Sequence, residues 1–219
     1  MNPLDLLTFA RGSAMNWALM IFLAGIVLRL FEIVGLGRKH DLSRARTVTT
    51  GSGWRTVFMR SWPAAGMIKR DPVTYLAGYV FHIGLLIVVF CYAPHIDFIR
   101  SMTGLNWRGL PSTLVDAMAL VSIIALLVLL AHRLTNPVKR LLSGFGDYLA
   151  WGLTLLPLLT GYLAFHHQLF EYTLMLSLHL FSVELLLVLL PFTKLFHSFT
   201  VFLSRWYNGE MAARKGVVS

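Results

Sequence analysis

Residues 174–203 read LMLSLHLFSVELLLVLLPFTKLFHSFTVFL, a long apolar run that contains His179 and His197. The two histidines are eighteen residues apart, or five turns of an α-helix, so both imidazoles would project from one face, roughly 27 Å apart along the axis. This separation is close to the thickness of a bilayer core, about 30 Å. Because ionisable side chains inside a membrane are costly and usually functional, the run predicts two stacked metal or haem sites, one near each membrane surface.

The composition of the whole chain indicates an integral membrane protein. Of its 219 residues, 57% are hydrophobic and 13% are charged, and the mean hydropathy is +0.68. Soluble domains carry about 25% charged residues. The single cysteine, Cys91, cannot hold an iron–sulfur cluster, which needs several thiolates. Any iron–sulfur chemistry must therefore belong to a partner.

Five segments are long and apolar enough to span a bilayer. They are residues 14–34, 73–96, 113–131, 148–166 and 173–203. We therefore predict a single membrane domain over 1–219, an all-α bundle of five transmembrane helices with its termini on opposite sides. The N-terminal run lacks a basic leader and an obvious cleavage site, so we expect the first span to be retained.

The net charge of +9 is concentrated in three regions, which hold fifteen of the 19 lysines and arginines. They are Arg38, Lys39, Arg44, Arg46, Arg55, Arg60, Lys69 and Arg70 in the 35–72 loop, Arg133, Lys139 and Arg140 after the third span, and Lys194, Arg205, Arg214 and Lys215 near the C-terminus. The positive-inside rule places these regions in the cytoplasm and the N-terminus outside, in the cell inner membrane. The charge thus indicates topology and not nucleic-acid binding. We expect the loop to contact a cytoplasmic partner, with a solvated connector as the alternative.

Four histidines lie at matching depths on two spans. His82 is in the inner half of the second span, and His95 follows Pro94 at its outer end. Because the second and fifth spans run in opposite directions, His82 shares the cytoplasmic side with His197, and His95 shares the outer side with His179. Four neutral imidazoles can ligate two haems axially. In an ideal helix His82 and His95 are about 140° apart in azimuth, so Pro94 must break or kink the helix to turn His95 inward.

Small and polar neighbours add further expectations. Gly78 and Gly84 around His82 would let a flat porphyrin approach, although small residues also serve helix packing. Glu184 lies mid-span, where a helix–helix hydrogen bond is the favoured role and proton movement the alternative. The candidates for a quinone site, or for plain interfacial positions, are the outer polar groups His95, Asp97, Arg100, His166 and His167.

Three strings resemble the gamma subunit of respiratory nitrate reductases and related five-span dihaem cytochromes b. They are FHIG at 81–84, RLTNPVKR at 133–140 and, after His179, PFTKLFH at 191–197. The resemblance covers most of the chain and implies that His82 and His197 ligate the cytoplasm-proximal haem b, while His179 ligates the outer one. In that family the second outer ligand belongs to a Gly-His pair, where this chain has Cys91 and Tyr92. His95 is then the expected substitute, with His166 or His167 as alternatives.

The resemblance also implies a function. A quinol, menaquinol or ubiquinol, would be oxidised near the outer haem, and electrons would pass through the inner haem to a cytoplasmic iron–sulfur oxidoreductase subunit, with reverse flow equally allowed. Relatives of the family work with heterodisulfide-reductase-like iron–sulfur proteins, and this chain is at least as similar to those. The alternative from another class is a haem-free membrane anchor or small transporter, surrounded by lipid, whose histidines serve packing or proton relay.

Overall fold

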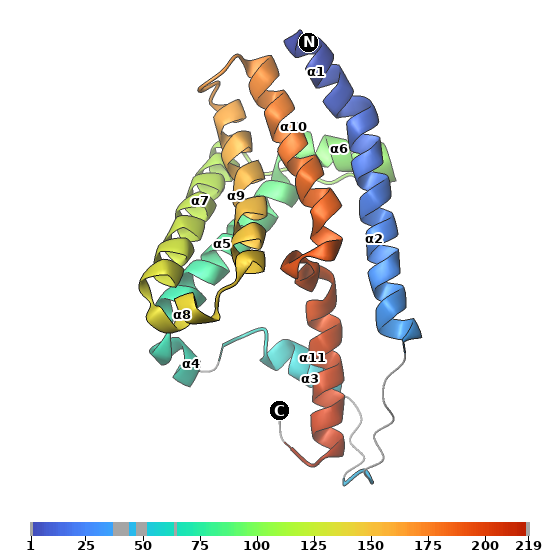
Figure 1. The fold of residues 1–219 in the computed structure, drawn as a ribbon, viewed down its shortest axis with the longest axis vertical. Helices are drawn as coiled ribbons and strands as arrows, with labels where there is room; N and C mark the ends of the chain where they lie inside the picture. The colour runs from blue at the N-terminus through green and yellow to red at the C-terminus, as the bar shows by residue number, and fades with distance from the viewer. Residues whose placement is uncertain (1, 37–43, 47–51, 64, 218–219) are drawn as a thin grey trace.

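The computed structural model describes residues 2–36, 44–46, 52–63 and 65–217, and these residues form helices and connections without any strand. Five helical stretches are long and apolar enough to cross a membrane (Figure 1). They are Pro3–Gly35, Pro72–Cys91, Ser112–Thr135, Phe145–Phe165 and Tyr172–Phe192. The predicted all-α, five-span fold is confirmed, and the chain is a multi-pass membrane protein. Arg38 and Lys39 of the predicted basic loop lie outside the described residues.

The first span joins three helical pieces end to end. They are α1 (Pro3–Phe9), the π-helical turn η1 (Ala10–Ala14) and α2 (Met15–Gly35). The helix begins well before the predicted residue 14 because the Asn2 side chain caps it and Pro3 occupies the first helical position.

The second, third and fourth spans are α5 (Pro72–Cys91), α7 (Ser112–Thr135) and α9 (Phe145–Phe165). Asp71 caps α5, and its carboxylate accepts a hydrogen bond from the Thr74 N–H. The Lys139 ammonium, 2.6 Å from that carboxylate, holds the pKa of Asp71 well below its usual range. Helix α9 is capped by Gly144, whose N–H donates to the Asp147 carboxylate at 3.0 Å.

The predicted single helix over 173–203 is wrong. Helix α10 (Tyr172–Leu189) is followed by two short 3₁₀ turns, η2 (Leu190–Phe192) and η3 (Lys194–Phe196), and then by α11 (His197–Arg214). Pro191 has no N–H to donate, and its ring clashes with the carbonyl one turn earlier in a continuous helix. Thr193 is fully extended, with φ −117° and ψ 178°. His197 therefore begins a new helix, and the five-turn spacing does not decide where it points.

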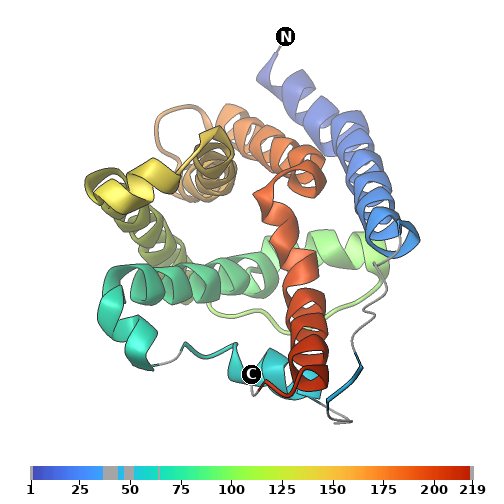
Figure 2. The ribbon, with the colours of Figure 1, turned by 60° about the horizontal axis from the view of Figure 1, so that its bottom comes forward.

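The spans pack in series around an open ring (Figure 2). Helix α5 packs along α7, α7 along α9, α9 along α10, and α10 along the first span. The core of this series is aliphatic and aromatic, formed by Ala77 and Phe81 of α5, Ile123 and Leu126 of α7, and Leu158 of α9. The histidines of α5 and of the α10–α11 segment thus come from helices at opposite ends of the series α5, α7, α9 and α10.

The shorter helices lie at the two ends of the bundle. Near the C-terminal end, α3 (Ser52–Met59) packs on α11, and its Gly53 N–H donates to Glu210 Oε1 at 2.7 Å. The remaining short helices are α4 (Ala65–Arg70), α6 (Ala93–Thr103) and α8 (Pro137–Leu142). Helix α11 and α3 extend beyond the ends of the spans in Figure 1.

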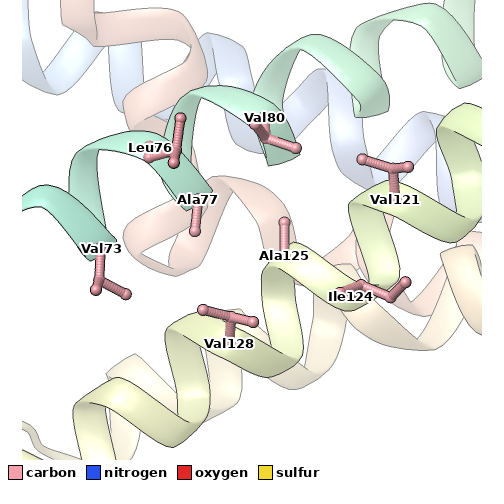
Figure 3. A pocket seen from close by; sticks show the side chains of 8 residues that line it. All are labelled: Val73, Leu76, Ala77, Val80, Val121, Ile124, Ala125 and Val128. Atoms are coloured by element: carbon pink, nitrogen blue, oxygen red, sulfur yellow. The ribbon is translucent and has the colours of Figure 1, made fainter.

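A shallow hollow between α5 and α7 is lined by aliphatic side chains alone (Figure 3). Its walls are Val73, Leu76, Ala77, Val80, Val121, Ile124, Ala125 and Val128. With no polar group in its lining, this hollow offers neither a ligand for a metal nor a hydrogen bond for a quinone, and it suits the acyl chain of a lipid. The chemistry of the chain has to be sought elsewhere.

Candidate functional site

The structure brings the four histidines together as two facing pairs. The ring centres of His82 and His197 are 6.2 Å apart, with the ring planes at 78°. The ring centres of His95 and His179 are also 6.2 Å apart, with the planes at 22°. Each pair joins one imidazole from the α5–α6 segment to one from the α10–α11 segment. We call them the inner pair (His82 and His197) and the outer pair (His95 and His179).

The spacing within each pair fits one metal ion between two imidazoles. A bond of about 2.0 Å from a metal to each ring nitrogen, with about 1.2 Å from nitrogen to ring centre, puts two opposed rings about 6.4 Å apart. Both pairs are within a few tenths of an ångström of that separation. Among the described residues, no group of three or more metal-ligating side chains comes together. Two imidazoles are too few for a structural zinc site, which takes four ligands, whereas a haem iron takes its axial ligands in this number.

The Nδ1 atom of each imidazole is held by an oxygen atom of the protein. His82 Nδ1 is 2.7 Å from the Gly78 carbonyl, and His95 Nδ1 is 2.8 Å from the Val88 carbonyl. His197 Nδ1 is 2.8 Å from the Lys194 carbonyl, and His179 Nδ1 is 3.3 Å from Thr160 Oγ1.

These contacts determine which ring nitrogen carries the proton. A carbonyl can only accept, so Nδ1 donates in His82, His95 and His197, and the lone pair of a neutral ring lies on Nε2. No donor or acceptor within the described part of the chain reaches Nε2 of any of the four rings. The inner pair therefore presents two Nε2 lone pairs and His95 presents one in the outer pair, which is the arrangement found when an outer hydrogen bond orients a metal-binding histidine.

A break in the second span turns His95 toward His179. Tyr92 is extended, with φ −82° and ψ 126°, and Pro94 sits in the first turn of α6. The last carbonyls of α5 then find partners across the break. His95 Nδ1 donates to Val88, Trp107 Nε1 to Phe90 at 2.6 Å, and the Leu110 N–H to Cys91 at 2.9 Å.

This break is the feature that the sequence predicts at Pro94, and Trp107 is a residue that sequence reasoning missed. Burial lowers the pKa of His95, which keeps its imidazole neutral, the form that binds a metal.

Two neighbouring residues of α9 shape the position of His179. The Thr160 hydroxyl donates to the Leu156 carbonyl at 2.8 Å, which leaves its oxygen free to accept from His179 Nδ1. A Cβ on Gly161 would lie 2.9 Å from His179 Cε1, so only glycine leaves this ring its present place. Sequence reasoning missed both residues. A threonine beside a glycine is too common in membrane helices to signal a site by itself.

An ion pair anchors the turn that positions His197. Lys194, whose carbonyl accepts from His197 Nδ1, extends its ammonium to Asp147 Oδ2 at 2.7 Å. Arg133 lies 3.5 Å from the other carboxylate oxygen of Asp147. The start of α9 and the end of α7 thus hold the segment from which α11 begins.

The two glycines near His82 have different roles. A Cβ on Gly78 would meet nothing within 4 Å, so space is open beside the ring. A Cβ on Gly84 would collide with Ser122 and approach the Met118 carbonyl, which makes Gly84 a packing residue between α5 and α7. His82 and His197 both remain exposed although they face each other, while the rings of the outer pair are half-buried.

The polar groups proposed for a quinone site are not joined to one another. His166 Nε2 is 2.8 Å from Asp116 Oδ1, and His167, in a left-handed conformation with φ 53°, stacks on Tyr172 with ring centres 4.7 Å apart. Asp97 and Arg100 are exposed on α6. Within the described residues, no hydrogen bond or ion pair links these groups to one another. The ring that pairs with His179 is that of His95, and not that of His166 or His167.

Glu184 does not make the helix–helix hydrogen bond expected of it. It is 7% exposed, and its Oε1 atom has no partner within the described residues. The carboxyl group is on α10 between His179 and the break at Pro191.

The fold and the two pairs define the class of protein as an all-α, multi-pass membrane protein with two facing imidazole pairs. No family model matches the chain. A protein of Nitratidesulfovibrio vulgaris, described simply as "Protein", is 28% identical over 215 residues, which cover 92% of each chain. The similarity extends over nearly the whole membrane domain but names no activity.

Proposed function

We propose that this chain is the membrane cytochrome b subunit of a respiratory oxidoreductase complex. The inner and outer pairs would each hold one haem b, and electrons would pass between a quinone and a cytoplasmic iron–sulfur partner. One observation carries the proposal: the ring centres of each pair are 6.2 Å apart, a separation that would admit one metal ion between them, with all four Nδ1 atoms bonded to the protein and no described residue bonded to any of the four Nε2 atoms.

The residues of the chain contribute binding, orientation and an apolar environment. Carbonyl and hydroxyl oxygens orient the four rings, and the open space at Gly78 accommodates a flat group beside His82. A bound haem would supply the one-electron redox chemistry. The aliphatic and aromatic core of α5, α7 and α9 contributes an apolar environment, in which charges interact strongly.

The charge distribution supports an orientation with the inner pair on the cytoplasmic side. Helix α8, which carries Lys139 and Arg140, lies at the end of the bundle from which α11 extends (Figure 1), and the Lys194 carbonyl accepts from His197 of the inner pair. By the positive-inside rule this end faces the cytoplasm, in the cell inner membrane. A quinol, either menaquinol or ubiquinol, would release two electrons and two protons near the outer pair, where Asp97, Arg100, His166 and His167 are the candidate contacts. The electrons would leave one at a time through the inner pair to the iron–sulfur subunit.

The test is an absorption spectrum of the purified protein in detergent. We expect reduced-minus-oxidised bands of b-type haem, with about two haems per chain. His197→Ala should remove the signal of one haem and leave the other. His166→Ala is the matched control, because that outer histidine is held by Asp116, and both haem signals should remain. A folded protein without a Soret band would refute the proposal in favour of the haem-free anchor or transporter.

A further inference from the structure

Glu184 is a buried carboxyl group that the ligation of two haems does not use. It is the thirteenth of the 21 residues of the span Tyr172–Phe192, close to the middle of the membrane. Its exposed fraction is 7%, and its Oε1 atom has no hydrogen-bond partner among the described residues. A charged or unsatisfied polar group at this depth is costly, so an unpartnered carboxyl there calls for a functional reason.

The surface opposite Glu184 is closely packed and uncharged. Helices α2 and α10 run side by side in the same direction (Figure 1), and a Cβ on Gly25 would lie 2.8 Å from Pro191. Counting back seven residues on both helices places Ala18, which is 3% exposed, level with Glu184. By this count Glu184 is level with a small apolar residue of α2 that has no hydrogen-bonding side chain.

Among the described residues, no counter-charge compensates Glu184 from the helices packed on α10. The charged residues of these helices are Asp5 of α1, Arg11 of η1, Arg29 and Glu32 of α2, and Asp147 of α9. Arg29 is paired with Glu32 at 2.7 Å, and Asp147 with Lys194. Arg11 and Arg29 lie roughly 10 and 16 Å along the helix from the level of Ala18.

The titratable groups of α9 lie on another side of α10. Ser182, which meets α9 through Thr160 at 2.9 Å, is about 200° around the helix from Glu184. Tyr148 and Tyr162 belong to that α9 side. Two factors therefore remain that act on the ionisation of Glu184. They are its burial and the charge of the group that the histidine pairs would bind.

We propose that Glu184 takes up and releases one proton as the haem held by the outer pair is reduced and oxidised. The inference rests on the proposed function. His179 and Glu184 are five residues apart on α10, roughly 7.5 Å along the axis and about 140° around it. In a low-dielectric medium charges interact over such separations, so one electron added to the haem held by the outer pair would disfavour the Glu184 carboxylate. The Glu184 carboxylate then binds one proton drawn from water, and on oxidation the electron and the proton both leave. The charge inside the membrane is the same before and after.

The experiment compares the purified wild-type protein with Glu184→Gln, which keeps the shape and loses the titrating proton. The matched control is Glu171→Gln, an exposed glutamate that precedes the same helix. Redox titration over a range of pH should show that the midpoint potential of one haem in the wild type falls as pH rises, approaching one proton per electron. Glu184→Gln should abolish that dependence for the outer haem, and Glu171→Gln should retain it. Removing the inner haem with His197→Ala identifies which signal is the outer one.

Infrared difference spectra provide a readout that does not depend on potentials. Reduction of the wild type should produce a protonated-carboxyl band that is absent in Glu184→Gln and shifted in Glu184→Asp, the variant that serves if the glutamine form does not fold. A dihaem protein whose carboxyl band and pH dependence are the same in all variants would overturn the role of Glu184 alone. A protein that binds no haem would overturn both this role and the proposed function.

Discussion

The inner and outer pairs have the same ring separation but are built in different ways. In the inner pair each Nδ1 donates to a carbonyl of its own segment, four residues back for His82 and three residues back for His197. In the outer pair His179 Nδ1 contacts the Thr160 hydroxyl of another helix. His95 Nδ1 donates to the Val88 carbonyl, across the interruption between α5 and α6. Local hydrogen bonds thus orient both rings of the exposed pair, whereas the half-buried pair needs another helix to orient His179 and the break after α5 to orient His95. Substitutions in neighbouring helices should therefore affect the outer pair more.

The largest effect is expected at Gly161. In Gly161→Val the new side chain would occupy the place of the His179 ring, because even a Cβ there would be 2.9 Å from Cε1. We expect the outer haem to be lost and the inner haem to be retained, as measured by haem content and the reduced-minus-oxidised spectrum. Gly152→Val on the same helix is the control, since a Cβ at Gly152 meets nothing within 4 Å. Equal spectra for the two variants would show that His179 does not need this space.

A smaller loss is expected from Thr160→Val, which keeps the shape of the side chain and removes the acceptor of His179 Nδ1. Loss of an outer hydrogen bond to a metal-binding histidine typically lowers affinity about 10- to 100-fold. Haem retention during dilution in detergent measures this change for each haem. Thr154→Val provides the control, because the Thr154 hydroxyl bonds only carbonyls of its own helix. If both variants retain the outer haem equally, Thr160 does not orient His179.

The smallest effect is expected at the inner pair, from Asp147→Asn. The asparagine can still accept from Gly144 but loses the ion pair with the exposed Lys194. Exposed ion pairs contribute little, so we expect about a two- to fivefold loss of inner-haem affinity. Asp116→Asn, which breaks the contact with His166, should leave the inner haem unchanged. If Asp147→Asn lowers the inner-haem affinity as much as Thr160→Val lowers the outer-haem affinity, the two pairs do not differ in how much they need contacts from other helices.

Much of the candidate site could be predicted from residue types and helix directions. The pairing of His82 with His197 and of His95 with His179 follows from two spans that run in opposite directions, and the structure has these pairs. The break before His95 could be expected from Pro94. Thr160 and Gly161, which hold the outer pair in place, could not be predicted from the sequence. They lie on a third helix, and packing decides how that helix is rotated about its axis.

The fifth span shows where helical periodicity misled the sequence interpretation. An ideal helix over 173–203 places His179 and His197 on one face. In the structure two 3₁₀ turns between Leu190 and Phe196 interrupt the α-helix. Pro191 and the extended Thr193 end the helix, and the Lys194 anchor redirects α11. A proline at position 191 makes a kink in this span the ordinary expectation. A complete interruption is not expected, since membrane helices often continue past a proline.

The order of residues is enough to predict five membrane spans, because backbone in lipid must form helices and apolar length sets their number. It also shows which spans carry the four histidines. Helix packing brings the ring centres of each pair to 6.2 Å and selects the oxygen atoms that bind each Nδ1. It also leaves Glu184 Oε1 without a partner among the described residues. The physical reason is that hydropathy is a property of each segment, whereas facing rings and unpaired carboxyls depend on where helices break and how their neighbours pack.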